Sequence, residues 1–247
     1  MHSDALALRA RSIAAVRPSR PTETEGRHAQ ARPAETARDD RRFRSRQDRL
    51  AARGSPACQS RDVLLTALAE CAPEVGHHST GVGHLAESTA YRLGLERDQQ
   101  VEVRLAGELH DVGKVAIPNG ILSKPGGLTR EERLVVEQHP VIGERILAAA
   151  PALANVARLV RSSHEWMDGT GYPDRLAGED IPLGARLVAV CDAYDAMVSD
   201  RPYRRAMDAE AALAELERSA GFQFEADIVV LVREAIPETQ GRVPGLR

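Results

Sequence analysis

The chain has 247 residues, of which 43% are hydrophobic and 28% are charged, and its formal net charge is −3. This balance is typical of a globular protein and gives no general attraction to nucleic acids or membranes. Aromatic residues make up only 3% of the chain, so the core must be aliphatic, which favours helices. Three cysteines without paired spacing predict reduced thiols in a cytoplasmic protein. No apolar run approaches the roughly 18 residues of a membrane span, and no signal peptide is evident.

The N-terminal part differs from the rest in composition. Residues 1–60 contain 13 arginines, no lysine and seven acidic residues, with few large apolar side chains. We therefore expect residues 1–58 to form an Arg-rich arm that is disordered or weakly ordered. A solvated tail and an arm that binds RNA or a protein partner are both left open. The globular domain is expected over residues 59–238, with a C-terminal tail at 239–247.

From residue 61 onward, helical spacing of apolar residues recurs between loops. It predicts helices, in chain order, around residues 63–68, 83–93, 99–112, 129–137, 142–147, 153–165, 183–199 and 209–220. Thr129 and Glu132 form a capping box, and Asp208 is placed to cap the last helix. Pro140 interrupts the helical pattern and places His139 at a break. No segment alternates as a strand would, so we predict an all-α fold of about six to eight helices.

Residues able to bind metals follow the same helices. His110 and Asp111 are adjacent at the end of an apolar helix, so both side chains should be at least partly buried. A buried carboxylate must be paired or bound to a cation. Imidazole nitrogens with carboxylate oxygens suit Fe, Mn or Zn, and without thiolates a closed structural zinc site is not expected. A carboxylate that bridges two metals would support in-line displacement at phosphorus.

Three motifs carry a resemblance to a known family. They are His110-Asp111 with Gly113-Lys114, "HEWMDGTGYP" at 164–173, and "DAYDAMVSDRPYRRA" at 192–206. The chain resembles the HD-GYP family of cyclic di-GMP phosphodiesterases from about residue 64 to 236. The resemblance implies an HD-domain-like helical bundle that hydrolyses cyclic di-GMP to linear pGpG in bacterial signalling. Whether GMP follows as a product is left open.

The resemblance also implies a set of site residues. The matching metal ligands, with Asp111 as the bridge between ions, are Glu74, His78, His110, Asp111, His139, His164 and Asp192. They would hold two or three divalent ions, with Fe or Mn favoured. Asp195, one turn after Asp192, is expected to orient a ligand or Lys114. His77 and His84 match no ligand position and are expected to be structural or surface residues.

The chain contains only two lysines, Lys114 and Lys124. A compact ammonium beside the metals would neutralise a phosphate oxygen or assist the departing 3′-oxygen better than a guanidinium. Lys114 is therefore predicted to act in catalysis together with Asp111. Lys124 matches a family phrase, and both a packing role and a functional role are left open.

The "GTGYP" loop and the arginines after it are implied to bind substrate. Gly169 and Gly171 permit positive φ or close approach, and Tyr172 is expected to stack on a guanine or hydrogen-bond near the site. Arg201 and Arg204 are expected to hold phosphates. In the family this loop also contacts cyclase domains, which makes a cyclase a candidate partner. No specific nucleic acid and no membrane are expected as partners.

The chain departs from the family pattern at two positions, of which the first bears on activity. Ser163 stands where the first histidine of a His-His-Glu run is expected, and a neutral hydroxyl is a poorer ligand than imidazole. Gly81 stands where many members carry arginine. Three hypotheses therefore stay open: an active phosphodiesterase, a catalytically weakened module that binds cyclic di-GMP or a cyclase, and a phosphohydrolase with another substrate.

Overall fold

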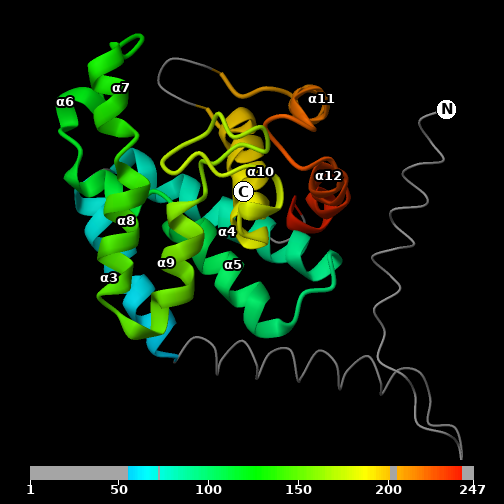
Figure 1. The fold of residues 1–247 in the computed structure, drawn as a ribbon, viewed down its shortest axis with the longest axis horizontal. Helices are drawn as coiled ribbons and strands as arrows, with labels where there is room; N and C mark the ends of the chain where they lie inside the picture. The colour runs from blue at the N-terminus through cyan, green and yellow to red at the C-terminus, as the bar shows by residue number, and fades with distance from the viewer. Residues whose placement is uncertain (1–54, 72, 201–204, 241–247) are drawn as a thin grey trace, which may run out of the picture. The chain divides into compact units, whose positions relative to one another are not determined.

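Helices and connecting loops account for the described part of the chain (Figure 1). The structure, a computed structural model, describes residues 55–71, 73–200 and 205–240, without the side chains of 71–78 and 237–240. All of them belong to one compact unit, residues 48–247. Within these ranges there is no strand, only an isolated bridge between Ala220 and Phe224, which confirms the predicted all-α fold.

The α-helices, in chain order, are α3 (Pro56–Cys71), α4 (Pro73–Arg92), α5 (Arg97–Leu109), α6 (Asn119–Leu122), α7 (Arg130–Val136), α8 (His139–Ala148), α9 (Ala154–Arg161), α10 (Leu183–Val198), α11 (Ala209–Ser219) and α12 (Ala226–Gln240). Short 3₁₀ helices are η1 (Val112–Ala116), η2 (Pro151–Leu153) and η3 (Gly178–Asp180). The sequence analysis missed α12, although Ile228, Val229 and Val232 are buried at helical spacing.

Local sequence signals explain several helix ends. The Thr129 hydroxyl accepts a hydrogen bond from Glu132 N at 3.2 Å, and the Glu132 carboxylate accepts one from Thr129 N at 2.7 Å, so the predicted capping box is present. The predicted Asp208 cap is also confirmed. The predicted break at His139 lies directly before that residue instead, since α7 ends at Val136, Glu137 and Gln138 form the break, and His139 already begins α8.

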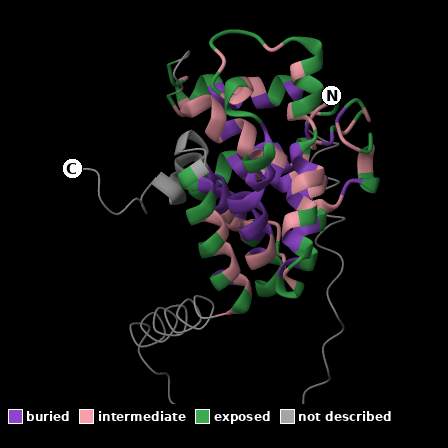
Figure 2. Cartoon of the chain, turned by 90° about the vertical axis from the view of Figure 1, so that its left-hand side faces the viewer, coloured by how far each residue is buried: buried purple, intermediate pink, exposed green. Residues whose placement is uncertain are grey.

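Close backbone contact between α4 and α5 organises the centre of the unit. A Cβ added to Gly107 would lie 3.0 Å from the Cα of Gly83, so both glycines are needed where these helices touch. Helices α10 and α12 pack on α4, while α8 packs on α9 and η1. The buried residues of these helices gather in the middle of the molecule, as Figure 2 shows.

A buried ion cluster joins α3 to the end of α5. The Glu108 side chain is only 2% exposed and accepts hydrogen bonds from Arg61 at 2.7 Å and from Arg104 at 2.9 Å. A buried carboxylate requires such partners, because burial removes its hydration. The cluster thereby fixes the last turn of α5, directly before His110.

The structure describes little of the two ends of the chain. The predicted arm, apart from the start of α3, and most of the predicted C-terminal tail lie outside the described residues. Among the helices that the structure describes, none combines the length and the apolar character needed to cross a membrane.

Candidate metal centre

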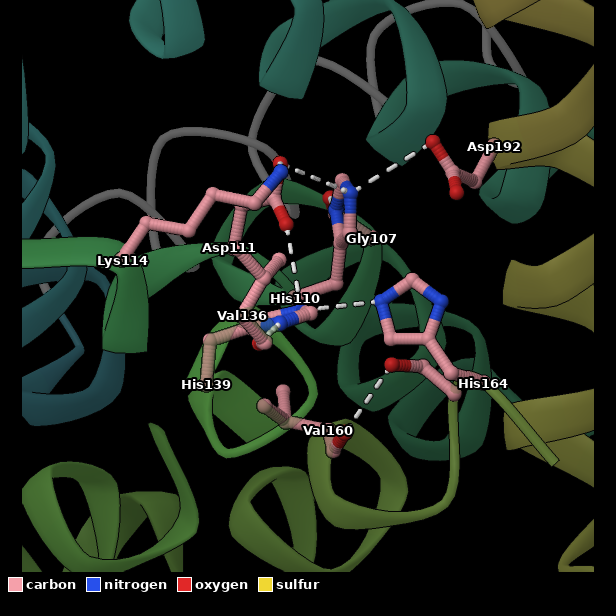
Figure 3. Close-up of polar contacts among 10 residues, drawn as sticks. Gly107, His110, Asp111, Lys114, Val136, His139, Val160, His164 and Asp192 are labelled. Carbon is pink, nitrogen blue, oxygen red and sulfur yellow. Dashed lines mark hydrogen bonds and ion pairs between the residues drawn. The ribbon is translucent and has the colours of Figure 1, made fainter. Parts of the chain in front are cut away.

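Four parts of the fold bring histidine and aspartate side chains together (Figure 3). His110 and Asp111 lie at the junction of α5 and η1, His139 begins α8, His164 follows α9, and Asp192 lies in α10. His110, Asp111 and His139 are at most 3% exposed. The sequence analysis predicted all five as metal ligands, and the fold brings them into one cluster.

The shortest separations define the cluster. One ligand atom each of Asp111, His139 and His164 lies within 4.8 Å of the others. The Nε2 of His139 is 3.4 Å from Asp111 Oδ1 and 2.9 Å from His164 Nε2. The Nε2 of His110 is 3.5 Å from both Asp111 Oδ2 and Asp192 Oδ1. Nitrogen and oxygen lone pairs therefore converge on a small volume.

Backbone carbonyls fix two of the imidazole rings. The Nδ1 of His110 donates to Gly107 O at 2.8 Å, and the Nδ1 of His139 donates to Val136 O at 2.7 Å. A carbonyl oxygen only accepts, so the proton of each neutral ring is on Nδ1 and the Nε2 lone pair faces the cluster. This tautomer is the one that metal-ligating histidines adopt when their second nitrogen is hydrogen-bonded.

Protonation favours the same arrangement. Burial lowers the pKa of His139 to about 4 and that of His164 to about 3, so both rings are neutral near pH 7. Burial works against ionisation of Asp111, but Lys114, His110 and His139 hold the pKa of that carboxyl below its usual range. Burial also disfavours a charge on His110, yet Asp111 and Asp192 raise its pKa. The cluster therefore offers neutral imidazoles at His139 and His164 and an ionised carboxylate at Asp111, whereas the two neighbouring carboxylates favour the charged form of His110.

An unsatisfied carboxylate oxygen tests whether a cation fits here. Asp111 Oδ1 is buried and has no hydrogen-bond partner among the described residues. Buried polar atoms without partners are rare in folded proteins and call for an explanation. A divalent ion held by Asp111, His139 and His164 would satisfy this oxygen and the facing nitrogens together. Mixed imidazole and carboxylate donors without thiolate suit Fe, Mn or Zn.

The two lysines occupy different environments. Lys114 Nζ is 2.6 Å from Asp111 Oδ2, and its side chain keeps 24% of its exposure, so the ammonium borders both the cluster and solvent. It pairs with Asp111 rather than with Asp195. Lys124 binds both carboxylate oxygens of Glu132, at 2.6 and 2.8 Å, and so ties its loop to α7. That contact supports the packing role for Lys124.

The GYP loop lies against the cluster. The Tyr172 ring stacks on the His164 ring, with centroids 5.1 Å apart and planes 12° apart. Gly169 has a φ of +78°, and a Cβ on Gly171 would lie 2.6 Å from Glu165 Cα and from His164 O. Positive φ and close approach were both predicted for these glycines. Gly169 requires the positive φ, and Gly171 requires the close approach.

Some predicted site residues lie outside the description. These are the side chains of Glu74 and His78 on α4, together with Arg201 and Arg204; the side chain of His77, predicted to be no ligand, also lies outside the described residues. His84 is exposed, in agreement with its predicted surface position. Asp195 Oδ2 accepts a hydrogen bond from Ser199 Oγ at 3.3 Å.

The structure shows what surrounds Ser163 and Gly81, the two residues that depart from the family pattern. Ser163 is 2% exposed, and its hydroxyl donates to Val160 O at 2.9 Å, so the side chain is bonded to the end of α9. A Cβ on Gly81 would lie 2.5 Å from Asp195 Oδ1, so any larger residue would have to displace that carboxylate. Gly81 therefore leaves room for Asp195.

The sequence analysis assigned no role to the residues that hold the GYP loop. Glu165 is 2% exposed, and its carboxylate accepts hydrogen bonds from Asp174 N at 2.6 Å and Leu176 N at 3.1 Å. Arg161 binds both carboxylate oxygens of Asp174, at 2.6 and 2.8 Å. An acidic residue directly after a ligand histidine was the available signal, but its bonding partners follow only from the loop conformation.

The described part of the chain is therefore an all-helical protein, and its buried histidine and aspartate side chains form a candidate divalent-metal centre. The family model for the HD domain matches residues 50–228. The chain therefore belongs to the HD domain family. The curated relatives named cyclic di-GMP phosphodiesterases agree with the resemblance to the HD-GYP family of these enzymes.

Three similar proteins illustrate this relationship. The cyclic di-GMP phosphodiesterase response regulator RpfG of Xanthomonas campestris is 44% identical over 146 residues, which cover 58% of this chain and 39% of RpfG. The 3′3′-cGAMP-specific phosphodiesterase 2 of Vibrio cholerae is 38% identical over 163 residues, covering 65% of this chain and 31% of that protein.

The solved structure of Bd1817, an HDG"Y"P protein of Bdellovibrio bacteriovorus, matches with a TM-score of 0.56 and 19% identity. The match covers 66% of this chain and 52% of Bd1817. At this identity the likeness concerns the fold alone. The chain thus spans well under half the length of the two curated relatives described above.

Proposed function

We propose that this protein is a metal-dependent phosphodiesterase that opens cyclic di-GMP to linear pGpG. The observation that carries the proposal is the buried Asp111 carboxylate, whose Oδ1 lacks a hydrogen-bond partner among the described residues while neutral imidazoles face it. Names of relatives supply the substrate class, since RpfG is a cyclic di-GMP phosphodiesterase and a second relative is specific for 3′3′-cGAMP. Cyclic di-GMP is the substrate favoured by the motifs.

Asp111, His110, His139, His164 and Asp192 would hold the metal ions, with Asp111 as the bridge. Glu74 and His78 are proposed to complete a centre of two or three ions, with Fe or Mn favoured. Such ions supply stabilisation of negative charge and activation of water in phosphodiester hydrolysis.

Side chains of the protein would bind the substrate and supply a proton in the reaction. In the reaction the hydroxyl of water bonds to phosphorus, the bond from phosphorus to the 3′-oxygen breaks, and that oxygen gains a proton. Lys114 borders the cluster and would neutralise a phosphate oxygen or supply this proton. Arg201 and Arg204 are proposed to hold the phosphates of the ligand. Tyr172 is proposed to stack on a guanine or to hydrogen-bond near the site, with the part of its side chain that is not packed on His164.

Location and partners follow the same proposal. Cys58 and Cys191 are free and buried, which suits the reducing cytoplasm that we propose as the location. Contact of the GYP loop with a cyclase domain stays a prediction.

The test combines metal analysis with turnover on one sample. Anaerobically purified protein should contain at least two Fe or Mn ions per chain and should convert cyclic di-GMP to pGpG. Assays with 3′3′-cGAMP and cyclic di-AMP would reveal a different substrate. Cyclic di-GMP binding without turnover, in a protein holding one ion or none, would overturn the enzymatic proposal in favour of a binding module.

The Ser163 hydroxyl is the observation that favours such a binding module. It donates to Val160 O and is no equivalent of an imidazole ligand. Replacing Ser163 with histidine should add a ligand, increase the number of bound ions and raise turnover by about tenfold or more, the scale on which changes near a metal act. Metal analysis and pGpG formation would measure both effects.

Ser163→Ala is the matched control, because it removes the hydroxyl without adding a donor and should leave metal content unchanged. A folded Ser163→His protein with wild-type metal content and wild-type turnover would show that position 163 does not limit the centre. Melting temperature would establish that the larger ring is accommodated.

A further inference from the structure

The three imidazoles of the cluster are held in two different ways. His110 and His139 each donate from Nδ1 to a backbone carbonyl, which fixes the plane of the ring. Among the described residues, the Nδ1 of His164 has no hydrogen-bond partner, while its Nε2 lies 2.9 Å from the Nε2 of His139. The plane of the His164 ring must therefore be set by packing.

That packing comes from Tyr172. The two rings are nearly parallel, at 12°, with centroids 5.1 Å apart, and the Tyr172 N–H donates to the His164 carbonyl at 3.2 Å. Offset stacking at this separation is attractive and has a preferred geometry. His139 meets the His164 ring edge-on at 4.7 Å, so His164 is bounded by one ring stacked on it and another at its edge.

Tyr172 is itself held by the segment that follows it. The buried Glu165 carboxylate accepts two backbone N–H groups, those of Asp174 and Leu176, at 2.6 and 3.1 Å. Because Glu165 directly follows His164, this bond closes a short loop that returns Tyr172 to the His164 ring. Burial of a carboxylate is costly without such donors, so the contact holds the loop in one conformation.

A second contact ties the same loop to the helices beneath it. Arg161, the last residue of α9, binds Asp174 through two nitrogens and reaches Glu144 on α8 at 2.6 Å. Paired contacts of this kind fix direction as well as distance. The loop is thereby connected to α8, the helix that begins with His139.

We propose that Tyr172 takes the place of the missing carbonyl and orients His164 for metal binding, and that Glu165 and the Arg161–Asp174 pair hold Tyr172 in position. Tyr172, Glu165, Arg161 and Asp174 are then positioning residues, since they act through His164. The inference rests on the proposed function, because it requires that His164 binds a metal ion. It assigns the GYP loop a role in the metal centre besides any contact with substrate.

Titration with Co²⁺ tests this, since the visible absorption of bound Co²⁺ reports its ligand geometry. Tyr172→Leu should weaken Co²⁺ binding by about tenfold or more and alter the absorption spectrum, as changes beside metal ligands do. Tyr172→Phe keeps the ring and should bind as the wild type does. Glu165→Gln should also weaken binding, because its amide group cannot accept both N–H groups equally well.

Glu179→Gln is the matched control, since Glu179 is an exposed glutamate in the segment after the loop and has no side-chain hydrogen bond among the described residues. It should leave Co²⁺ affinity unchanged. Fluorescence of Trp166, the only tryptophan of the chain, would show that each variant keeps the loop folded.

Wild-type Co²⁺ affinity and spectrum in a folded Tyr172→Leu protein would overturn the inference, and a raised KM for cyclic di-GMP in that protein would leave Tyr172 as a substrate contact alone. Loss of affinity in Glu165→Gln without loss in Tyr172→Leu would also overturn it, because the loop would then act by another route. If the wild type bound no Co²⁺ and hydrolysed no cyclic dinucleotide, the proposed function would fail, and the inference with it.

Discussion

Replacing Asp111 with asparagine should reduce cyclic di-GMP hydrolysis about a thousandfold and remove bound metal. The carboxylate faces His139 through Oδ1 and both His110 and Lys114 through Oδ2, so it is the group that joins the two halves of the cluster. An amide is neutral and would balance the charge of bound cations less well than the carboxylate does. Losing several kcal/mol of charge stabilisation corresponds to about three powers of ten in rate.

Initial rates of pGpG formation and metal content of the same samples would measure this effect. Asp180→Asn is the control, because Asp180 is an exposed aspartate of η3 with no side-chain hydrogen bond or ion pair among the described residues, and its rate should equal that of the wild type. An Asp111→Asn protein with more than a tenth of wild-type activity would contradict the assignment of Asp111 as the bridging ligand.

Replacing Gly113 with alanine should disturb the centre through packing alone. A Cβ at this position would overlap the His139 carbonyl oxygen and lie 2.7 Å from Gly143 N, and both partners are backbone atoms that cannot turn aside. Overpacking of this kind costs about 1–3 kcal/mol of unfolding free energy, and more where backbone must move. Because α8 begins at His139, the displaced backbone carries a candidate ligand with it.

The rate should therefore fall as well, by about a hundredfold, the effect expected when a reacting group moves by roughly one ångström. Gly120→Ala is the matched control: apart from its chain neighbours and its own helix backbone, no described atom lies within 4 Å of the added Cβ, and its φ is not positive. Chemical denaturation would give both free energies of unfolding. Equal stability and equal rate in the Gly113 and Gly120 variants would contradict the packing argument.

Much of the site was accessible from sequence because the motifs specify residue types at fixed positions. His110, Asp111, His139, His164 and Asp192 were all predicted as ligands, and they meet in the structure. The environment of Lys114 was predicted too, although its direct contact with Asp111 was not. Assigning Lys124 to packing required the position of Glu132, which the sequence left open.

Other features could not be read from the chain because they depend on contacts between distant segments. Nothing in "HEWMDGTGYP" indicates that the tyrosine ring lies on the histidine ring of the same motif. The role of Glu165 follows from two backbone N–H groups whose direction is set by the loop conformation. Helix α12 differs from these features, because its apolar residues have a helical period that made it predictable from sequence.

The sequence by itself determined the helical class and the capping residues, since helical period and capping are local properties, and its motifs determined the candidate ligands through their resemblance to a known family. Only the tertiary structure decided which nitrogen of His110 and His139 carries the proton, because carbonyls of Gly107 and Val136 accept it. It also decided that Asp111 Oδ1 is buried without a hydrogen-bond partner among the described residues. Burial and lone-pair direction arise when α5, α8, α9 and α10 pack together, and these two properties make a set of residues a candidate metal centre.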